Sequence, residues 1–206
     1  MSHRFADIAF TPSVKQVQQR LGSRAAYARN EQVTEPFNHV LTEAEAQFIA
    51  ARDSLYMASV GETGWPYIQH RGGPAGFVRV LDPQTIGFAD FRGNRQYISL
   101  GNLLTDERVS LFFMDYANRT RLKLLGRARV VDPEDVETLG KLAVPGYRGT
   151  VERGIVITVE GFDWNCPQHI TERYSLDDVR KLTAPLLSRI ADLEAQLLKH
   201  VGAAND

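Results

Sequence analysis

The chain has 206 residues, of which 43% are hydrophobic and 24% charged, a size and composition typical of one globular domain with or without appended segments. Its formal net charge of −1 argues against a nucleic-acid-binding or membrane-surface protein. Cys166 is the only cysteine, which excludes an intrachain disulfide and a cysteine metal cage. No apolar run approaches the roughly 18 residues of a membrane span, and the N-terminus lacks a signal-peptide core, so a cytoplasmic location is the default expectation.

Residues 1–40 are polar and interrupted, which predicts an N-terminal extension that wraps the domain instead of folding separately. Val14, Val17 and Leu21 indicate one short helix within it. A further helix is expected after Thr42, because Thr42-Glu43-Ala44-Glu45 is typical of a capped helix start. We expect the main domain to occupy residues 41–170.

From residue 54 onward the apolar pattern changes to a period of two, which predicts β-strands. The expected strands are residues 54–60, 65–70, 76–81, 85–89, 109–116, 121–131 and 154–162. Tight turns join most of them, so the sheet should be largely antiparallel, and a closed or split barrel is favoured over one open sheet. Residues 133–142 are predicted to be helical, with Pro133 in the first turn.

The C-terminal segment, residues 171–206, has a different pattern. Leu182, Leu186, Ile190, Leu193 and Leu197 follow one another at helical spacing, with charged residues between them. We therefore expect an amphipathic helix that buries one stripe, with Pro185 at a kink or restart.

Residues 88–103, FADFRGNRQYISLGNL, suggest an anion site where a strand ends and a helix begins. Gly93 permits a tight turn, and Asn94 is a favourable N-cap for a helix that starts there. Arg95 and Gln96 would then lie beside the positive end of the helix dipole. Ser99 and Asn102 would share the helix face of Arg95. An ordinary capped surface helix is the alternative.

Two other segments carry polar groups suited to a ligand. Gln69, His70 and Arg71 end a strand just before Gly72-Gly73-Pro74, and the arginine fork suits a phosphate, although a plain hairpin-to-loop transition fits equally well. Arg121 begins the strand at 121–131, whose basic residues share one face. A solvated basic face is the simpler explanation for that pattern.

The segment Trp164-Asn165-Cys166-Pro167-Gln168-His169-Ile170 follows the last expected strand. Trp164 offers a face for stacking, Gln168 can bond to a ring nitrogen or carbonyl, and His169 could donate to a substrate anion. A buried plug that closes the barrel is the alternative. The five histidines are scattered without metal-ligand spacing, and there is no G-x-S-x-G nucleophile motif, so we expect no metal and identify no catalytic residue.

Together, Gly64-Trp65-Pro66-Tyr67, FADFRGNRQ, the run ending VSLFFM and WNCPQHI resemble the pyridoxamine 5'-phosphate oxidase-like, FMN-binding split-barrel family. Within it, the chain is similar to the predicted flavin-nucleotide-binding branch that has an N-terminal extension. The resemblance covers about residues 40–170 and implies a mainly β protein with flanking helices. It also implies a six-stranded antiparallel split barrel that forms a homodimer, with FMN between the subunits.

The resemblance also implies which residues contact FMN. Arg95 and Gln96 match the positions that hold the phosphate, and Arg121 matches a polar flavin contact. Further matches are Gln69, His70, Arg71, Phe88, Ala89 and Asp90, with Asn94, Ser99, Asn102, Trp164 and Gln168 as additional expected contacts and His169 as a substrate contact.

The chain departs from pyridoxamine-phosphate oxidases in two ways. Gln96 replaces the usual lysine, and the C-terminal arginine and histidine pattern that recognises the vitamin phosphate is missing, which argues against vitamin B6 oxidation. An FMN-dependent oxidoreductase acting on a small molecule is therefore the leading hypothesis. The alternatives are a non-catalytic flavin- or tetrapyrrole-binding protein, for storage or sensing, and a dimeric interaction module.

Overall fold

The computed structural model describes residues 3–28, 35, 37–164 and 167–203. The chain forms two compact units. The first contains Met1–Asp115 and Thr120–Pro167, and the second contains Tyr116–Arg119 and Gln168–Asp206.

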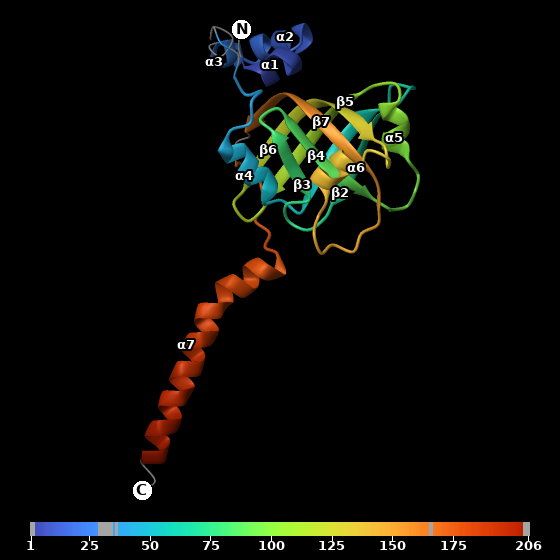
Figure 1. Cartoon of the computed structure of the whole chain (residues 1–206). Helices are drawn as coiled ribbons and strands as arrows, with labels where there is room; N and C mark the ends of the chain where they lie inside the picture. Colours follow the sequence, from blue (N-terminus) through green and yellow to red (C-terminus); the bar gives the residue numbers. More distant parts are fainter. Residues whose placement is uncertain (1–2, 29–34, 36, 165–166, 204–206) are drawn as a thin grey trace. The chain divides into compact units, whose positions relative to one another are not determined.

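The first unit is built on one antiparallel sheet of seven strands in the order β2-β1-β5-β6-β7-β4-β3 (Figure 1). The strands are β1 Ser54–Val60, β2 Pro66–Gly72, β3 Val78–Asp82, β4 Thr85–Phe91, β5 Arg108–Asp115, β6 Thr120–Val131 and β7 Val151–Trp164. The mainly β, antiparallel fold is thus confirmed, with seven strands where the family resemblance implied six.

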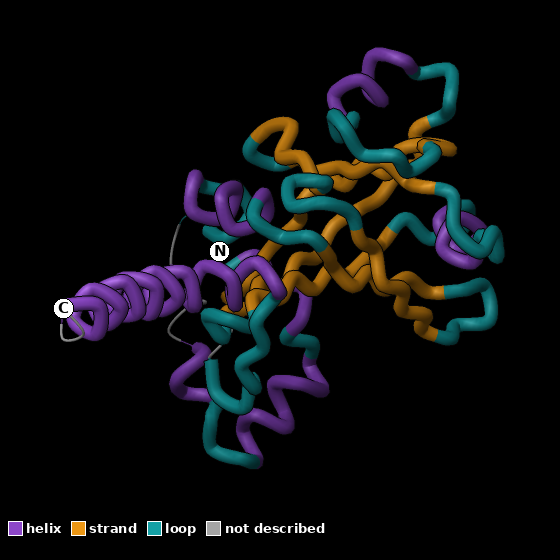
Figure 2. Tube along the Cα trace, turned by 90° about the horizontal axis from the view of Figure 1, so that it is seen from below, coloured by secondary structure: helices purple, strands orange, loops and turns teal. Residues whose placement is uncertain are grey.

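The chain connectivity forces this sheet to curl into a split barrel. β2 and β3 are the two edges of the sheet, yet they follow each other directly in the chain. A flat sheet would separate these edges by about 29 Å, six strand spacings, whereas the six steps from Gly72 to Val78 reach at most about 22 Å. The edges must therefore approach one another, and Figure 2 shows the curved sheet that results. The β2 and β3 edges share no backbone ladder, so the barrel is split there.

Alternating side chains fill the barrel interior. Leu55 and Met57 of β1, Leu111 and Phe113 of β5, and Leu122 of β6 are all essentially inaccessible to solvent. The basic residues of β6 alternate with these apolar ones and point outward, as the two-residue period predicts. Arg127 on that outer face pairs with Glu107 and Glu160, so it belongs to the solvated surface.

Six helices accompany the sheet in the described part of the first unit. They are α1 Arg4–Ala9, α2 Pro12–Arg20, α3 Arg24–Ala28, α4 Glu43–Ala50, α5 Ile98–Leu103 and α6 Val136–Leu142. The N-terminal extension thus holds three helices where the sequence indicated one. α4 begins at the predicted Thr42 cap, with a complete capping box to Glu45. α6 begins later than predicted, because the Asp135 side chain caps Thr138 and leaves Pro133 outside the helix.

The second unit contains α7, Leu176–Ala203, which agrees closely with the predicted C-terminal helix. Ser175 and Asp178 form reciprocal hydrogen bonds at its start. Pro185 lies inside the helix, which continues past it without a restart.

Gly126 lies at the β6–β7 register shift, where the backbones of the two strands come close together. Substituting it tests this close approach. A Cβ on Gly126 would lie 2.5 Å from the Thr158 carbonyl oxygen, a backbone atom that cannot move aside easily. We expect Gly126→Ala to lower the free energy of unfolding by about 1–3 kcal/mol in a denaturant titration. Gly101→Ala is the control, because its Cβ would meet nothing within 4 Å in α5, and it should raise stability by about 0.5–1 kcal/mol. Equal effects of the two substitutions would contradict this account.

Candidate functional site

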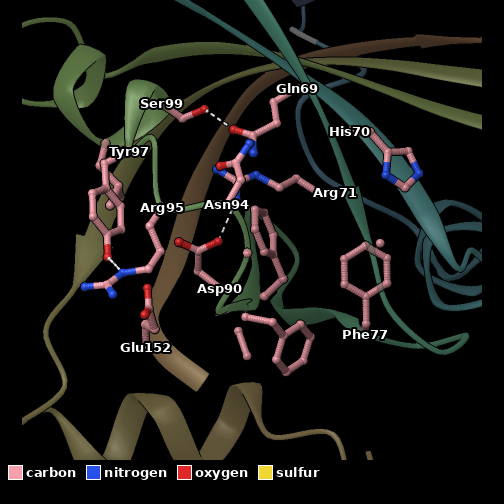
Figure 3. A pocket seen from close by; sticks show the side chains of 16 residues that line it. Gln69, His70, Arg71, Phe77, Asp90, Asn94, Arg95, Tyr97, Ser99 and Glu152 are labelled. Atoms are coloured by element: carbon pink, nitrogen blue, oxygen red, sulfur yellow. Dashed lines mark hydrogen bonds and ion pairs between the residues drawn. The ribbon is translucent and has the colours of Figure 1, made fainter. Parts of the chain in front are cut away.

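A pocket of about 250 Å³ lies where the barrel is split (Figure 3). It is between edge strand β2 and the end of β4, which extends beyond edge strand β3. It is lined by Gln69, His70, Arg71, Gly72, Phe77, Phe88, Ala89, Asp90, Phe91, Gly93, Asn94, Arg95, Tyr97, Ser99, Leu100 and Glu152.

An ion pair crosses the split at the base of this pocket. Arg71 Nη1 donates to Asp90 Oδ1 at 2.6 Å, and both side chains are largely buried. Arg153 of β7 lies on the other side of Asp90, with Nε 3.8 Å from Oδ2. Burial raises the pKa of Asp90, although the charges of Arg71 and Arg153 act to lower it. The Nε atom of Arg71 is buried and has no hydrogen-bond partner among the described residues.

The end of β4 offers free backbone to this pocket. The β3 ladder stops at Phe88, whereas the β7 ladder continues to Phe91. The pocket side of residues 89–91 therefore lacks a neighbouring strand. Phe88 and Phe77, whose ring centroids are 6.1 Å apart, lie behind this end of the pocket, where both rings are buried in the barrel core.

The segment between β4 and α5 differs from the prediction. α5 begins at Ile98, not at Asn94, and has no side-chain cap. Arg95 and Tyr97 adopt left-handed backbone angles, with φ of 60° and 56°, which prevents the helix from starting earlier. Asn94 instead accepts a hydrogen bond from the backbone N–H of Gln96 at 3.2 Å. Arg95 and Gln96 therefore do not lie in the first turn of a helix, and the prediction that a helix dipole acts on them is wrong.

Arg95 nevertheless lines the pocket from this loop. Its Nε donates to the Tyr97 hydroxyl at 2.9 Å, and this hydrogen bond raises the pKa of Arg95 (Figure 3). The guanidinium of Arg153 lies over the Tyr97 ring, 5.1 Å from its centroid. Tyr97 thus joins the exposed Arg95 to the buried charges around Asp90.

The predicted shared face of Arg95, Ser99 and Asn102 does not form, because Arg95 precedes the helix. Ser99 faces the pocket and donates to Gln69 Oε1 at 2.9 Å, so it couples α5 to β2. Asn102 is buried away from the pocket lining and donates to Ser59 at 2.9 Å.

Most of the predicted site residues meet at this one pocket. Those that line it are Gln69, His70, Arg71, Phe88, Ala89, Asp90, Asn94, Arg95 and Ser99. Gln96, Asn102, Arg121 and Trp164 do not line it. Arg121 lies above the Phe112 ring, 6.0 Å from its centroid, and its buried Nε has no partner among the described residues.

Trp164 has the packing expected of the plug alternative. Its ring meets Phe48 of α4 edge-on at 4.8 Å, and its Nε1 donates to Glu45 Oε1 at 2.8 Å. Asn165 and Cys166 lie outside the described residues. Gln168 and His169 belong to the second unit, where both are exposed, so their predicted contacts with ligand stay predictions.

Some pocket residues were not predicted from the sequence. Phe91 and Glu152 reach the pocket through the pairing of β4 with β7, whereas Phe77 reaches it from the link between β2 and β3. Tyr97 lines it from the loop before α5. No local pattern marks these four side chains, because their position depends on contacts between distant segments.

Within the described residues, no group of three or more histidine, cysteine or acidic side chains is arranged to hold a metal ion. The described helices also include none with the length and apolar character needed to cross a membrane.

The chain is similar to several solved structures. HupZ from Group A Streptococcus is 17% identical over 65% of this chain and 99% of its own, with a TM-score of 0.50. A conserved hypothetical protein from Mycobacterium tuberculosis is 19% identical, covering 70% of this chain and 97% of its own, with a TM-score of 0.47. A pyridoxinephosphate oxidase family protein from Clostridium acetobutylicum is 14% identical, covering 65% and 92%, with a TM-score of 0.43. No curated protein gives a significant match.

The split barrel with a pocket at its open edge defines the structural class of this protein. The profile of the pyridoxamine 5'-phosphate oxidase family matches residues 41–155. The chain belongs to this family.

The Trp164–Glu45 contact generates a pH-dependent prediction. Burial opposes ionisation of Glu45, but hydrogen bonds from Thr42 and Trp164 outweigh it and lower its pKa. The ionised carboxylate therefore stabilises the fold above the unfolded pKa of 4.5, and this contribution is lost as the pH falls through the lower folded value. We expect Glu45→Gln to cost about 1–3 kcal/mol at neutral pH and progressively less in acid, measured by urea unfolding. The exposed Glu43→Gln is the control, and a difference that does not vary with pH would contradict the assignment.

Proposed function

We propose that the protein binds FMN in the pocket between β2 and β4 and acts as a flavin-dependent oxidoreductase on a small molecule. The observation that carries this proposal is the composition of the pocket, which combines two arginines, the incompletely buried rings of Phe91 and Tyr97, and a free backbone edge. Family membership supports it, because related proteins often bind flavins.

The side chains present suit the two chemically different parts of FMN. Arg95 is exposed at the mouth, and Arg71 has an Nε without a partner among the described residues, so both can donate to a phosphate. Phe91 and Tyr97, which line the pocket and are not fully buried, offer apolar surface for a planar ring. Gln69 and the backbone of residues 89–91 can form hydrogen bonds with polar ring edges.

Bound flavin would supply hydride and electron transfer, so the protein needs only to bind it, orient it and shape a substrate pocket. The ion pair with Asp90 holds Arg71 in place across the split. The hydrogen bond to the Tyr97 hydroxyl holds Arg95 in place. A protein that only binds and orients a flavin does not need a nucleophile motif, and the sequence contains no G-x-S-x-G motif.

We propose further that the active form is a homodimer whose two subunits complete the site. A cavity of about 250 Å³ is small beside the roughly 300–1,000 Å³ of typical ligand sites, as expected for one subunit's share. The outer face of β1 and β2 exposes Tyr56, Val60 and Ile68, with Ile68 64% accessible. Phe112 of β5 lies beside Tyr56 in the register and extends this apolar face.

The proposal is tested first by the absorption spectrum of the purified protein. A flavin spectrum, and FMN as the chromophore released by heat, are expected. Reduction by NAD(P)H or dithionite, followed by reoxidation with candidate acceptors, then separates an oxidoreductase from a storage or sensing protein. Protein that is colourless and does not bind added FMN would refute the proposal.

We expect Arg95→Ala to weaken FMN binding by about 1.5–3 kcal/mol, roughly 10- to 150-fold, because a charge-assisted bond to the phosphate is lost. Riboflavin lacks the phosphate, so its affinity should change little. Flavin fluorescence titration measures both affinities. Arg108→Ala is the control, because Arg108 is exposed and pairs with Asp106 outside the pocket. Equal losses for FMN and riboflavin would show that Arg95 does not bind the phosphate.

We expect Ile68→Glu to weaken the dimer and to lower FMN affinity with it, because a charge would be buried in the proposed interface. Sedimentation velocity with flavin absorbance detection follows both quantities together. Val136→Glu adds the same charge to an exposed apolar position, 75% accessible, at the start of α6 and should change neither. A monomer that holds FMN as tightly as the unaltered protein would contradict the shared site.

A further inference from the structure

α7 exposes a long apolar stripe to solvent. Within this 28-residue helix, Leu186 is 64%, Ile190 50% and Leu193 46% accessible. Leu176, Val179, Leu182 and Leu197 are exposed in the same way. A helix with charged residues on one side and leucines on the other is stable in water only when the apolar side is covered.

The stripe follows a heptad repeat. In one register, the a positions are Leu176, Thr183, Ile190 and Leu197, and the d positions are Val179, Leu186, Leu193 and His200. After Pro185, the a and d positions are occupied in turn by Leu186, Ile190, Leu193, Leu197 and His200. At its centre, Ile190 at a lies between Leu186 and Leu193 at d, the combination that favours two parallel strands. Pro185 occupies a c position, so its ring points away from the seam and does not interrupt it.

The residues that flank the seam select one arrangement of two helices. In a parallel, in-register pair, each g position faces the e position five residues later on the other helix. Arg189 at g would then face Glu194 at e, and Leu182 would face Leu187, each contact occurring twice by symmetry. In the antiparallel arrangement that sets Ile190 against Leu186, Arg189 would instead face Arg189 of the second copy, which is repulsive.

We infer that α7 binds α7 of a second copy of this chain as a parallel, in-register coiled coil. The occupant is a second copy because Arg189 and Glu194 of one helix complement Glu194 and Arg189 of the other. From Leu176 to His200 the seam is about 36 Å long. This contact is separate from the proposed barrel interface and does not depend on flavin.

Disulfide trapping in the full-length chain tests the inference. In a Cys166→Ser background, Leu193→Cys places one thiol at a d position, and Ala195→Cys places one at f on the outer side. A disulfide needs Cα atoms within about 7 Å, so oxidation should link the Leu193→Cys chains at least about tenfold faster than the Ala195→Cys control. Both sites are on an exposed helix surface, and circular dichroism checks that each variant keeps its helix content.

A charge exchange tests the register. Arg189→Glu in the Leu193→Cys background should slow the trapping, and adding Glu194→Arg should restore it, because the g–e pair is re-formed with reversed signs. Slow trapping in both single-cysteine variants, or equal rates in the two, would overturn the inference. So would trapping only in a mixture of Leu193→Cys with Thr183→Cys, since that result shows antiparallel helices. Flavin content, measured on the same samples, shows separately whether the pocket is intact.

Discussion

The candidate site depends on one constraint, which is that the two edges of the sheet must meet without pairing their backbones. The short link from β2 to β3 brings the edges together, but each edge lacks a neighbouring strand. The Arg71–Asp90 ion pair spans the split instead of a ladder of backbone hydrogen bonds. Removing Asp90 would leave the buried Arg71 without its ion-pair partner, whereas removing Arg71 would leave Asp90 with only the more distant Arg153, 3.8 Å away. The residues that line the candidate site here therefore also hold the two edges of the sheet together.

The same constraint explains why the polar groups of the pocket come from separate parts of the chain. Gln69 lies on β2, Ser99 on α5 and Glu152 on β7, and the curl of the sheet brings them to one opening. The surrounding barrel is apolar and closely packed, with Leu111, Phe113 and Leu122 completely buried. A rigid core of this kind holds the side chains at its rim in fixed positions, which a binding site needs.

Local patterns in the sequence predicted the strands, the Thr42 capping box and the C-terminal helix, because each of these depends on nearby residues. They also pointed to Arg71 and Arg95, and the family resemblance added Asp90; all three line one pocket. The predicted start of α5 at Asn94 was wrong. Asn94 has the chemistry of an N-cap, but Arg95 and Tyr97 adopt left-handed backbone angles, so the helix begins only at Ile98. Trp164 was ambiguous for another reason. Its partner Glu45 lies 119 residues earlier in the chain, and no local pattern reveals such a contact.

The strand order also determines how the barrel can assemble during synthesis. β7 is the last strand to be made, yet it lies between β6 and β4 and pairs with both. Until residues 151–164 have left the ribosome, β4 and β6 each present an unpaired edge, and the β3–β4 hairpin has no place in the sheet. A nascent chain that stops before β7 therefore has two unpaired strand edges and an incomplete apolar core. Such a chain is prone to aggregate. Closure of the barrel is a late, long-range event, and the candidate pocket can form only after it.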